Sequence, residues 1–357
     1  MSIDVVALDP SAEAWIDALS DVRHDAYHLP SYVSFAARHH EVGEPRLFVA
    51  EGSGGRLLLP LIVRRLPTDV AGDADLWDAT SSRGYPGPTV AAARLDHRFI
   101  AQAIKALRDY LAEHRIVSAF VRLHPLLSIP DDALVGSGTV VDHGDSVYID
   151  LSKSDEELAG QMRHGHRQDI NRARRLGYET RIDDAWERFD DFVAVFHESM
   201  DRVGAVPFWR FSPQYFVDLR ESLSDRIRLC VVEKDGELAS AALVTEVDGI
   251  VEYHLAGTAN AHLRASPSKL VVDFLRRWSR DRGNRVLHLT GSLRRGDSLS
   301  SFKMGFSPLH RPVRSWRVVS HREHYARLIE NRRRHGTEPD GDDGYFPAYR
   351  RPRTDGG

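Results

Sequence analysis

The stretch that decides the fold is Arg46-Leu47-Phe48-Val49-Ala50-Glu51, which leads through a glycine-rich turn into Arg56-Leu57-Leu58-Leu59. The same pattern returns far downstream. There Arg228-Leu229-Cys230-Val231-Val232-Glu233 leads through Asp235-Gly236 into Glu237-Leu238-Ala239. Short apolar runs on either side of a tight turn are typical of a β-hairpin. The sequence therefore predicts two hairpins of the same design.

The likeness extends beyond the hairpins. Each is followed by more β-like sequence and then by a helix, expected at 96–114 in the first copy and at 268–282 in the second. An apolar strand follows each helix, at 116–123 and at 285–289. A chance similarity of two hairpins is the alternative, and the matching order of elements argues against it. We infer a duplicated unit with the order β-β-β-helix-β.

The repeat predicts an α/β (α+β) chain of tandem subdomains, each a mixed β-sheet flanked by helices. We place the first at 1–145 and the second at 146–335, and we expect a disordered tail at 336–357, which is rich in Gly, Asp, Arg and Pro. Ser154 and Glu157 have the spacing of a capping box, which predicts a helix that runs to Leu176 and stops at Gly177. The second subdomain is completed by a strand at 146–151, helices at 184–203 and 213–223, and hairpin turns at Asp235-Gly236 and Asp248-Gly249.

Charge is distributed unevenly along the 357 residues. The formal net charge is -4, but residues 1–150 hold 13 Lys and Arg against 21 Asp and Glu, a net of -8. Residues 264–335 hold 18 against 5, a net of +13. Such a basic segment fits an anionic partner, for example a nucleotide, a coenzyme or RNA. The alternative is a solvated arginine-rich surface.

Several classes of protein are excluded by the composition. Cys230 is the one cysteine, so no intramolecular disulfide forms, and its place in an apolar run indicates a core residue. The first ten residues carry Asp4 and Asp9 and lack the basic start and apolar stretch of a signal peptide. No run reaches the ~18 apolar residues that cross a bilayer. We therefore expect a cytoplasmic protein with no transmembrane segment.

The segment Ser298-Leu299-Ser300-Ser301-Phe302-Lys303-Met304-Gly305-Phe306 carries our first candidate for catalysis. It follows an apolar strand and a glycine-containing loop, and such a loop before a short helix exposes N–H groups to an anion. Lys303 adds a positive charge, and its apolar neighbours favour partial desolvation. Such a cation stabilises an oxyanion or a donor phosphate in acyl transfer. We expect Ser301 and Phe302 to contact substrate. An ordinary surface lysine is the alternative.

Arg163, Arg167 and Asn171 recur every four residues and so share one face of the expected helix. Guanidinium groups in a row suit phosphate binding through forked hydrogen bonds, which makes these residues candidates for substrate binding. A solvated amphipathic helix is the alternative. His164 and His166 are two residues apart and point in different directions, so we expect no metal site.

Tyr253 and His254 lie near the end of the third strand of the second subdomain, and successive strand residues face opposite sides. One of them is therefore expected to face the cleft where donor and acceptor meet. His254 is a candidate general base for an acceptor amine, and Tyr253 is a candidate for orienting donor or acceptor. Trp209 is a candidate for lining the acceptor pocket, and Tyr85 lies in a turn-rich loop that is a candidate cover for a site. Structural roles are the alternative for all four.

In this order, the segments resemble the Fem-type (FemAB-like) transferases of the GNAT acyltransferase superfamily. The resemblance covers about 15–317 and depends most on the R-x-x-I-x-x-A pattern at 167–173, followed by Gly177, and on the F-K-x-G-F of 302–306. Residues 253–258 and the duplicated hairpin support it. No Walker-type phosphate loop, G-x-S-x-G elbow, H-E-x-x-H motif or cysteine pair is present, so metal-dependent and covalent nucleophilic catalysis have no support.

The resemblance implies two GNAT-like subdomains, with a cleft between them or in the second, in which an acceptor amine attacks an activated acyl ester. Fem-type members use aminoacyl-tRNA as the donor and often a peptidoglycan precursor as the acceptor, while related members act in natural-product pathways. Arg167 and Lys303 would correspond to the family's residues for anionic substrates. Two departures stand out: the inserted coiled-coil arm of some bridge-forming members is missing, and so is the Q/R-x-x-G-x-G/A loop that cradles coenzyme A.

These observations lead to the hypothesis of an acyltransferase that moves an aminoacyl group from aminoacyl-tRNA onto an amine, with no cofactor beyond its co-substrate. Lys303 would stabilise the oxyanion or the leaving group, Arg167 would bind a phosphate, and Tyr253 or His254 would orient or deprotonate the amine. An acyl-CoA-dependent N-acyltransferase is the first alternative. A non-catalytic RNA- or nucleotide-binding module on this fold is the second.

Overall fold

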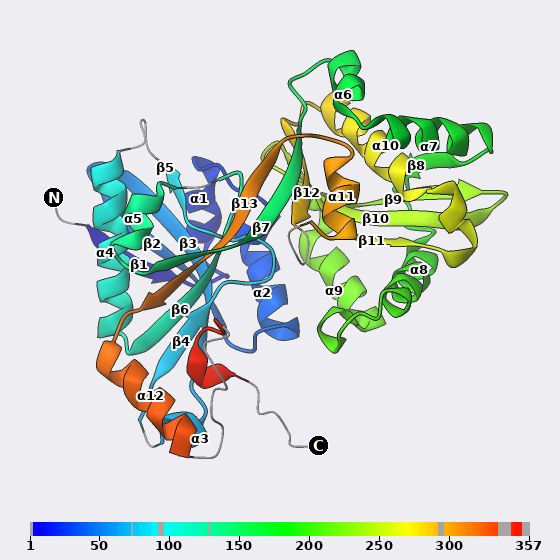
Figure 1. The fold of residues 1–357 in the computed structure, drawn as a ribbon. Helices are drawn as coiled ribbons and strands as arrows, with labels where there is room; N and C mark the ends of the chain where they lie inside the picture. Colours follow the sequence, from blue (N-terminus) through cyan, green and yellow to red (C-terminus); the bar gives the residue numbers. More distant parts are fainter. Residues whose placement is uncertain are drawn as a thin grey trace. The chain divides into compact units, whose positions relative to one another are not determined.

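The computed structural model describes residues 3–72, 74–91, 96–127, 129–291, 296–334 and 344–351 (Figure 1). Contacts divide the chain into two compact units. One consists of Met1–Asp142 together with Val313–Gly357, and the other is His143–Pro312. Both divisions fall inside strands, β7 (Thr139–Asp150) and β13 (His310–Val319), so each of these strands contributes residues to both units.

The first unit is built on a sheet with the strand order β1-β2-β3-β4-β6-β13, and β5 pairs with β3 at one end. β4 and β6 are parallel, whereas β1–β2, β2–β3, β3–β4 and β6–β13 are antiparallel. The strands not yet given are β1 (Asp4–Leu8), β2 (Glu44–Gly52), β3 (Gly55–Arg65), β4 (Trp77–Thr80), β5 (Thr89–Ala91) and β6 (Ile116–Leu123).

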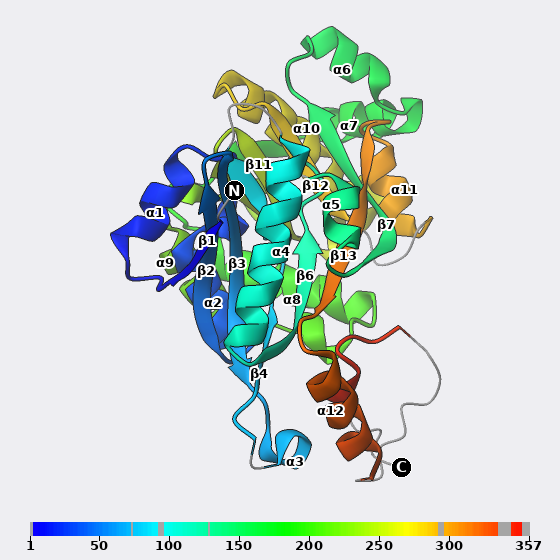
Figure 2. The ribbon, with the colours of Figure 1, turned by 90° about the vertical axis from the view of Figure 1, so that its left-hand side faces the viewer.

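Helix α4 (His97–Glu113) lies across one face of this sheet (Figure 2). Its apolar residues recur at helical spacing, and Phe99, Ile100 and Leu107 are buried against the strands in one core. Burial of this apolar stripe is what stabilises the helix in place. The other helical segments are α1 (Glu13–Ser20), η1 (Ala26–His28), α2 (Pro30–His39), α3 (Thr68–Ala71), α5 (Asp131–Val135), α12 (Arg322–Arg334) and η5 (Ala348–Arg350).

The C-terminal segments belong to the first unit, which differs from the boundary expected at 335. Trp316 on β13 is buried in the core of the first unit and donates its indole N–H to the Leu134 carbonyl at 3.1 Å. Leu328 on α12 and Tyr349 on η5 are buried in a second cluster of that unit. The expected disordered tail therefore contains an ordered anchor at 344–351, while 336–343 and 352–357 lie outside the described residues.

The second unit is built on a sheet with the order β7-β12-β11-β10-β9-β8. β11 and β12 are parallel, and the other neighbours are antiparallel. The type of turn sets the hairpins: Asp235 and Gly236, and then Asp248 and Gly249, all have positive φ, which Asp-Gly turns favour. The strands are β8 (Glu179–Ile182), β9 (Ile227–Lys234), β10 (Glu237–Val247), β11 (Ile250–Thr258) and β12 (Val286–Gly291).

Helices cover both faces of the second sheet (Figure 1). α10 (Ser268–Asp281) and α7 (His164–Arg175) pack on one face, and α8 (Phe189–Arg202) packs on β10 and β11 from the other. The remaining helical segments are α6 (Asp155–Gln161), η2 (Pro207–Trp209), α9 (Pro213–Leu223), η3 (Ser224–Arg226), η4 (Asn260–Ala265) and α11 (Ser298–Met304). Within the described ranges, no helix is both long and apolar enough for a bilayer crossing.

The predicted fold class is confirmed: β2-β3-β4-α4-β6 in the first unit and β9-β10-β11-α10-β12 in the second have the same order.

The prediction of a single helix from Ser154 to Leu176 was wrong. Its capping box forms, with Ser154 and Glu157 exchanging hydrogen bonds at 2.8 and 3.2 Å. The chain then breaks at Met162, whose backbone is extended, because the N–H of Arg163 donates outside the helix to the Gly305 carbonyl at 2.8 Å. The helix expected from 184 starts only at Phe189.

A buried ionic network lies in the first unit. Asp25 and His28 have no exposed surface and His124 is buried. His28 Nδ1 lies 2.8 Å from one Asp25 oxygen and His124 Nε2 lies 2.9 Å from the other. Burial alone would raise the pKa of the Asp25 carboxyl, but the two histidines outweigh it and hold that pKa well below its usual range. The carboxylate is therefore charged at neutral pH.

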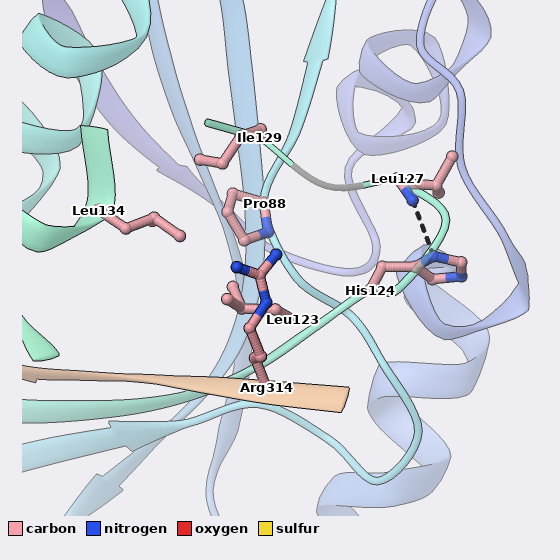
Figure 3. A pocket seen from close by; sticks show the side chains of 7 residues that line it. All are labelled: Pro88, Leu123, His124, Leu127, Ile129, Leu134 and Arg314. Carbon is pink, nitrogen blue, oxygen red and sulfur yellow. Dashed lines mark hydrogen bonds between the residues drawn. The ribbon is translucent and has the colours of Figure 1, made fainter. Parts of the chain in front are cut away.

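A small hollow beside this network is the pocket shown in Figure 3, lined by Pro88, Leu123, His124, Leu127, Ile129, Leu134 and Arg314. Both of its charged or titratable side chains have a partner. Nδ1 of His124 accepts from the Leu127 N–H at 3.1 Å, and the guanidinium of Arg314 pairs with Asp131. Because the rest of the lining is apolar and the charged group is neutralised, the hollow is a packing feature and not our candidate site.

Replacing Asp25 by Asn should destabilise the first unit strongly, because it leaves two buried histidines without their carboxylate. Loss of one partner of a buried pair costs about 3–5 kcal/mol. Urea unfolding at neutral pH, followed by tryptophan fluorescence, measures the change. The matched control is Asp17→Asn on the exposed side of α1, which should shift stability by no more than about 0.5 kcal/mol. Equal midpoints for the two variants would mean that the network does not stabilise the fold.

Candidate active site

The parallel strands at the centre of the second unit separate towards their carboxyl ends. Their pairing runs from Ile250 opposite Val286 to Glu252 opposite His288, and no later pair is formed in the described residues. Both strands then become irregular. His254 is an extra residue in β11 relative to β10, and β12 gains one residue relative to β7 between His288 and Gly291. Ligands of open α/β sheets bind outside carboxyl ends of this kind.

Lys303 on α11 reaches the end of β12. Its side chain is buried, with 5% exposure, and its Nζ donates to Thr290 Oγ1 at 3.0 Å and to the Gly291 carbonyl at 2.5 Å. Burial lowers the pKa of the amine to about 7, although Asp297 and Glu252 oppose the shift. An amine of this kind exists in both protonation states near neutral pH. The ordinary surface lysine considered above is thus excluded by burial.

Helix α11 is held in place by the start of α7. The N–H of Arg163 donates to the Gly305 carbonyl at 2.8 Å, and its guanidinium lies 3.4 Å from Ser301 Oγ. His166 donates from Nε2 to the Phe302 carbonyl at 3.0 Å. The structure therefore brings together four residues that the sequence singled out: Arg163, Ser301, Phe302 and Lys303.

One of the N–H groups at the start of α11 is already engaged within the chain. Asp297 caps the helix and its carboxylate accepts from the Ser300 N–H at 2.6 Å. The helix has seven residues, and the preceding loop at 292–295 lies outside the described residues. Anion binding at this helix start stays a prediction, and the charge of Lys303 is the feature that the described geometry characterises.

The arginine face of α7 is only partly available. Arg163 is exposed at the helix start, and Asn171 is exposed one turn beyond Arg167. Arg167 is half-buried and donates from Nη1 to the Ala159 carbonyl at 3.0 Å, so its guanidinium ties α7 to the end of α6. Of the three residues, Arg163 is the one placed next to Lys303 through Ser301.

Tyr253 and His254 have different surroundings. The side chain of Tyr253 belongs to the apolar core with Cys230, and burial, assisted by Cys230, raises the pKa of its phenol above the ordinary value. The phenol of Tyr253 is therefore protonated at neutral pH. His254 is half-buried at the bulge of β11, beside the place where β11 and β12 separate.

The two remaining candidates, Trp209 and Tyr85, each have aromatic neighbours. Trp209 is half-buried in η2, 5.1 Å from Phe208 and 6.3 Å from Phe211 between ring centroids, at the edge of an aromatic cluster on α8 and α9. Tyr85 belongs to the first unit, where its ring lies 6.0 Å from that of Tyr27.

Sequence reasoning missed a buried pair at the last paired row of β11 and β12. Glu252 and His288 are fully buried, and His288 Nδ1 lies 2.8 Å from both carboxylate oxygens. Glu252 is also one of the charges that act on Lys303. A polar residue in the middle of each apolar strand, Val251-Glu252-Tyr253 and Leu287-His288-Leu289, was the available signal.

Thr290 carries backbone strain. Its φ is +62°, in the left-handed region that a β-branched residue rarely adopts. Such a conformation costs on the order of 1–3 kcal/mol and persists where the surroundings impose it. Here it coincides with the bulge of β12 and with the hydrogen bond to Lys303.

Comparison with known proteins agrees with this geometry. Residues 160–304 match the family model of an acetyltransferase (GNAT) domain, a range that includes α7, the separated strands and Lys303. Among solved structures, FemX is 11% identical, covers 90% of this chain and 99% of its own, and has a TM-score of 0.70. The C-terminal domain of a protein described as a lysylphosphatidylglycerol synthetase from Agrobacterium fabrum is 13% identical, covers 89% and 94%, and has a TM-score of 0.54.

An L-PGS from Bacillus licheniformis is also similar, at 13% identity, 91% and 97% coverage and a TM-score of 0.53. No curated protein matches the sequence. The chain thus has the fold of the GNAT acyltransferases. The sequence motifs implied a fold like that of the Fem-type transferases, and the likeness to FemX confirms this fold.

Adding a methyl group at Gly305 should damage the contact between α7 and α11. A Cβ there would lie 2.2 Å from His166 Nε2, and the buried ring would have to move and lose its bond to Phe302. Overpacking of this kind costs about 1–3 kcal/mol. Gly165→Ala on α7 is the matched control, because its Cβ would meet open space. Thermal unfolding should show a lower Tm for Gly305→Ala and an unchanged or higher Tm for Gly165→Ala. Equal effects would contradict the tight contact.

Proposed function

We propose that this chain transfers an aminoacyl group from aminoacyl-tRNA to the amine of an acceptor, either a peptidoglycan precursor or a natural-product intermediate. In this reaction the acceptor nitrogen attacks the ester carbonyl, a C–N bond forms and the C–O bond to the tRNA ribose breaks. The amine loses a proton and the ribose oxygen gains one. The ester is already activated, so positioning and charge stabilisation supply the catalysis.

The observation that carries the proposal is the buried amine of Lys303 at the separated ends of β11 and β12, inside the segment that matches a GNAT domain. Two of its three N–H groups, when it is protonated, have partners in Thr290 and Gly291. Neither partner is a carboxylate, so the positive charge is not neutralised by an ion pair at hydrogen-bond distance. The third N–H is the donor that we assign to the oxygen of the tetrahedral intermediate.

His254 is the base that we assign to the acceptor amine. It sits at the β11 bulge beside the strand separation, and bulges of this kind re-aim a side chain. Tyr253, the other candidate, is confined to the core. Arg163 and Ser301 flank α11, and we assign the exposed guanidinium of Arg163 to a phosphate of donor or acceptor.

Acyl transfer from acyl-CoA is the second candidate function. The family model that matches 160–304 is described as an acetyltransferase domain, which favours this donor. The likeness to FemX across 90% of the chain favours the aminoacyl donor. Both reactions use the same attack by an amine and the same oxyanion, so the roles of Lys303 and His254 are shared, and the donor is what separates them.

Replacing Lys303 by Ala should reduce turnover by about 100-fold or more, the loss that follows removal of one oxyanion donor. Initial rates with saturating donor measure the effect. Lys105→Ala is the matched control, because Lys105 is an exposed lysine on α4 of the first unit. If Lys303→Ala stayed within about twofold of the native rate, the site would be wrong.

The pH dependence tests the charge of Lys303. Because its pKa is lowered to about 7, the amine is protonated below that pH and becomes neutral above it. A cationic role therefore predicts a rate limb that falls as pH rises through about 7. Lys303→Arg, which does not deprotonate, should be slower but should lose this falling limb. A rate that rises with pH in the native protein and has no falling limb would instead assign Lys303 as a base.

The donor is tested by offering labelled aminoacyl-tRNA, acetyl-CoA and longer acyl-CoA, with and without RNase. We expect acyl transfer to an amine acceptor only from aminoacyl-tRNA, lost after RNase treatment, and falling as salt is raised because phosphate contacts are screened. Activity that survives RNase would favour acyl-CoA. Binding of tRNA or nucleotide with no turnover from any donor would reduce the protein to a binding module.

A further inference from the structure

The end of β12 is irregular in a way that serves Lys303. Between His288 and Gly291 the strand advances three residues while its partner β7 advances two, from Tyr148 to Ser146. One residue is therefore extra, as in a β-bulge. Thr290 lies in this bulge with φ of +62°. Bulges are frequent next to active sites, where they re-aim a side chain.

The bulge in β12 allows a side-chain oxygen and a backbone carbonyl oxygen of consecutive residues to approach the same nitrogen. In a regular strand, side chains stand perpendicular to the sheet, whereas carbonyl groups lie within it towards neighbouring strands. A side-chain oxygen and the carbonyl oxygen of the next residue do not converge in that arrangement. Here Thr290 Oγ1 and the Gly291 carbonyl both lie within hydrogen-bond distance of one nitrogen, at 3.0 and 2.5 Å. The bulge is what makes them converge.

Both oxygens fix the direction of the amine. Lys303 has a flexible four-carbon stem, so one contact alone would leave Nζ free to rotate about it. Two acceptors from consecutive residues define a fork, and no other hydrogen-bond partner of Nζ is found in the described part of the chain. The remaining donor position is thereby fixed in direction as well.

We propose that Thr290 is a positioning residue for Lys303, and that its strained left-handed backbone is kept because it turns the hydroxyl and the following carbonyl onto the amine. This inference rests on the proposed function of Lys303 in acyl transfer. It goes further by assigning a task to a residue of the strand that touches no reacting atom.

The groups that surround the amine define what else influences its titration. Asp297 precedes α11, Glu252 lies on β11 and His288 on β12 is paired with Glu252. From α7, His166 contacts the Phe302 carbonyl of α11. The variants chosen below leave all four unchanged, so a shift in the titration of Lys303 reports on Thr290.

Three substitutions separate the hydroxyl from the strain. Thr290→Ser keeps the hydroxyl, Thr290→Val keeps the branched shape without it, and Thr290→Gly removes both hydroxyl and strain. We expect Thr290→Ser to stay within about threefold of the native rate. Thr290→Val and Thr290→Gly should lose about 10-fold in kcat, as for one hydrogen bond to a charged group. Thr290→Gly should nevertheless have an unchanged or higher Tm, because glycine adopts positive φ freely.

The pH profile distinguishes positioning from a merely structural role. Oγ1 accepts a hydrogen bond from the ammonium, so its loss should move the falling limb of the rate to lower pH by about one unit in Thr290→Val. Thr180→Val, on strand β8, is the matched control and should leave the limb in place. A lower Tm with an unchanged limb in Thr290→Val would overturn the inference.

A readout without turnover keeps this test separate from the proposed function. Competitive labelling of amines over a pH series, with mass spectrometry of the peptide that contains Lys303, gives the titration of that amine directly. Thr290→Val should shift it to lower pH even if Lys303→Ala proves active. If Thr290→Val shifts the titration of the Lys303 amine and Lys303→Ala is still active, the proposed function is rejected. The positioning of the amine by Thr290 then still stands. No shift would reject the positioning role whatever the activity.

Discussion

The second unit is organised around one ammonium group that has been removed from water. A buried cation is costly unless polar atoms surround it, and Nζ of Lys303 finds them in the hydroxyl of Thr290 and the carbonyl of Gly291. Our proposal connects several features of the unit to this amine. β12 contains a bulge, and Thr290 within it has a positive φ. His166 on α7 donates a hydrogen bond to Phe302 on α11, the helix that carries Lys303.

The duplicated units use equivalent strands in different ways. His124 follows β6 in the first unit. Its Nε2 bonds to the Asp25 carboxylate, and its Nδ1 accepts from the backbone N–H of Leu127. In the second unit, the last two residues of the equivalent strand β12 supply the two oxygens that bond to Lys303, the Thr290 hydroxyl and the Gly291 carbonyl. The first arrangement is internally satisfied and contributes stability. The second leaves one donor position uncommitted, and this difference is why the chemistry is assigned to the second unit.

Much of the fold was readable from local pattern. The hairpins followed from glycine-containing turns between apolar runs, and α4 and α10 followed from the repeated order of elements. Lys303 was found through a motif resemblance, since spacing alone favoured a surface lysine. What local pattern did not contain were contacts between distant segments. The N–H of Arg163 bonds to the carbonyl of Gly305, 142 positions away in the chain, and Thr290, with its positive φ, accepts a hydrogen bond from Lys303. Glu252 and His288 gave a signal, as polar residues inside apolar strands, that went unused.

The return of β13 to the first unit has a consequence for biosynthesis. The second unit is one continuous stretch, His143–Pro312, and the ribosome delivers it complete before the last strand of the first unit has been made. Until Val313–Val319 emerges, β6 has an open edge where β13 will later pair, and unpaired edges of this kind invite association with other chains. Folding on the ribosome therefore favours the inserted unit first. The edge of β6 stays unpaired until β13 is made, and the first residue of β13, His310, comes 187 positions after Leu123, the last residue of β6.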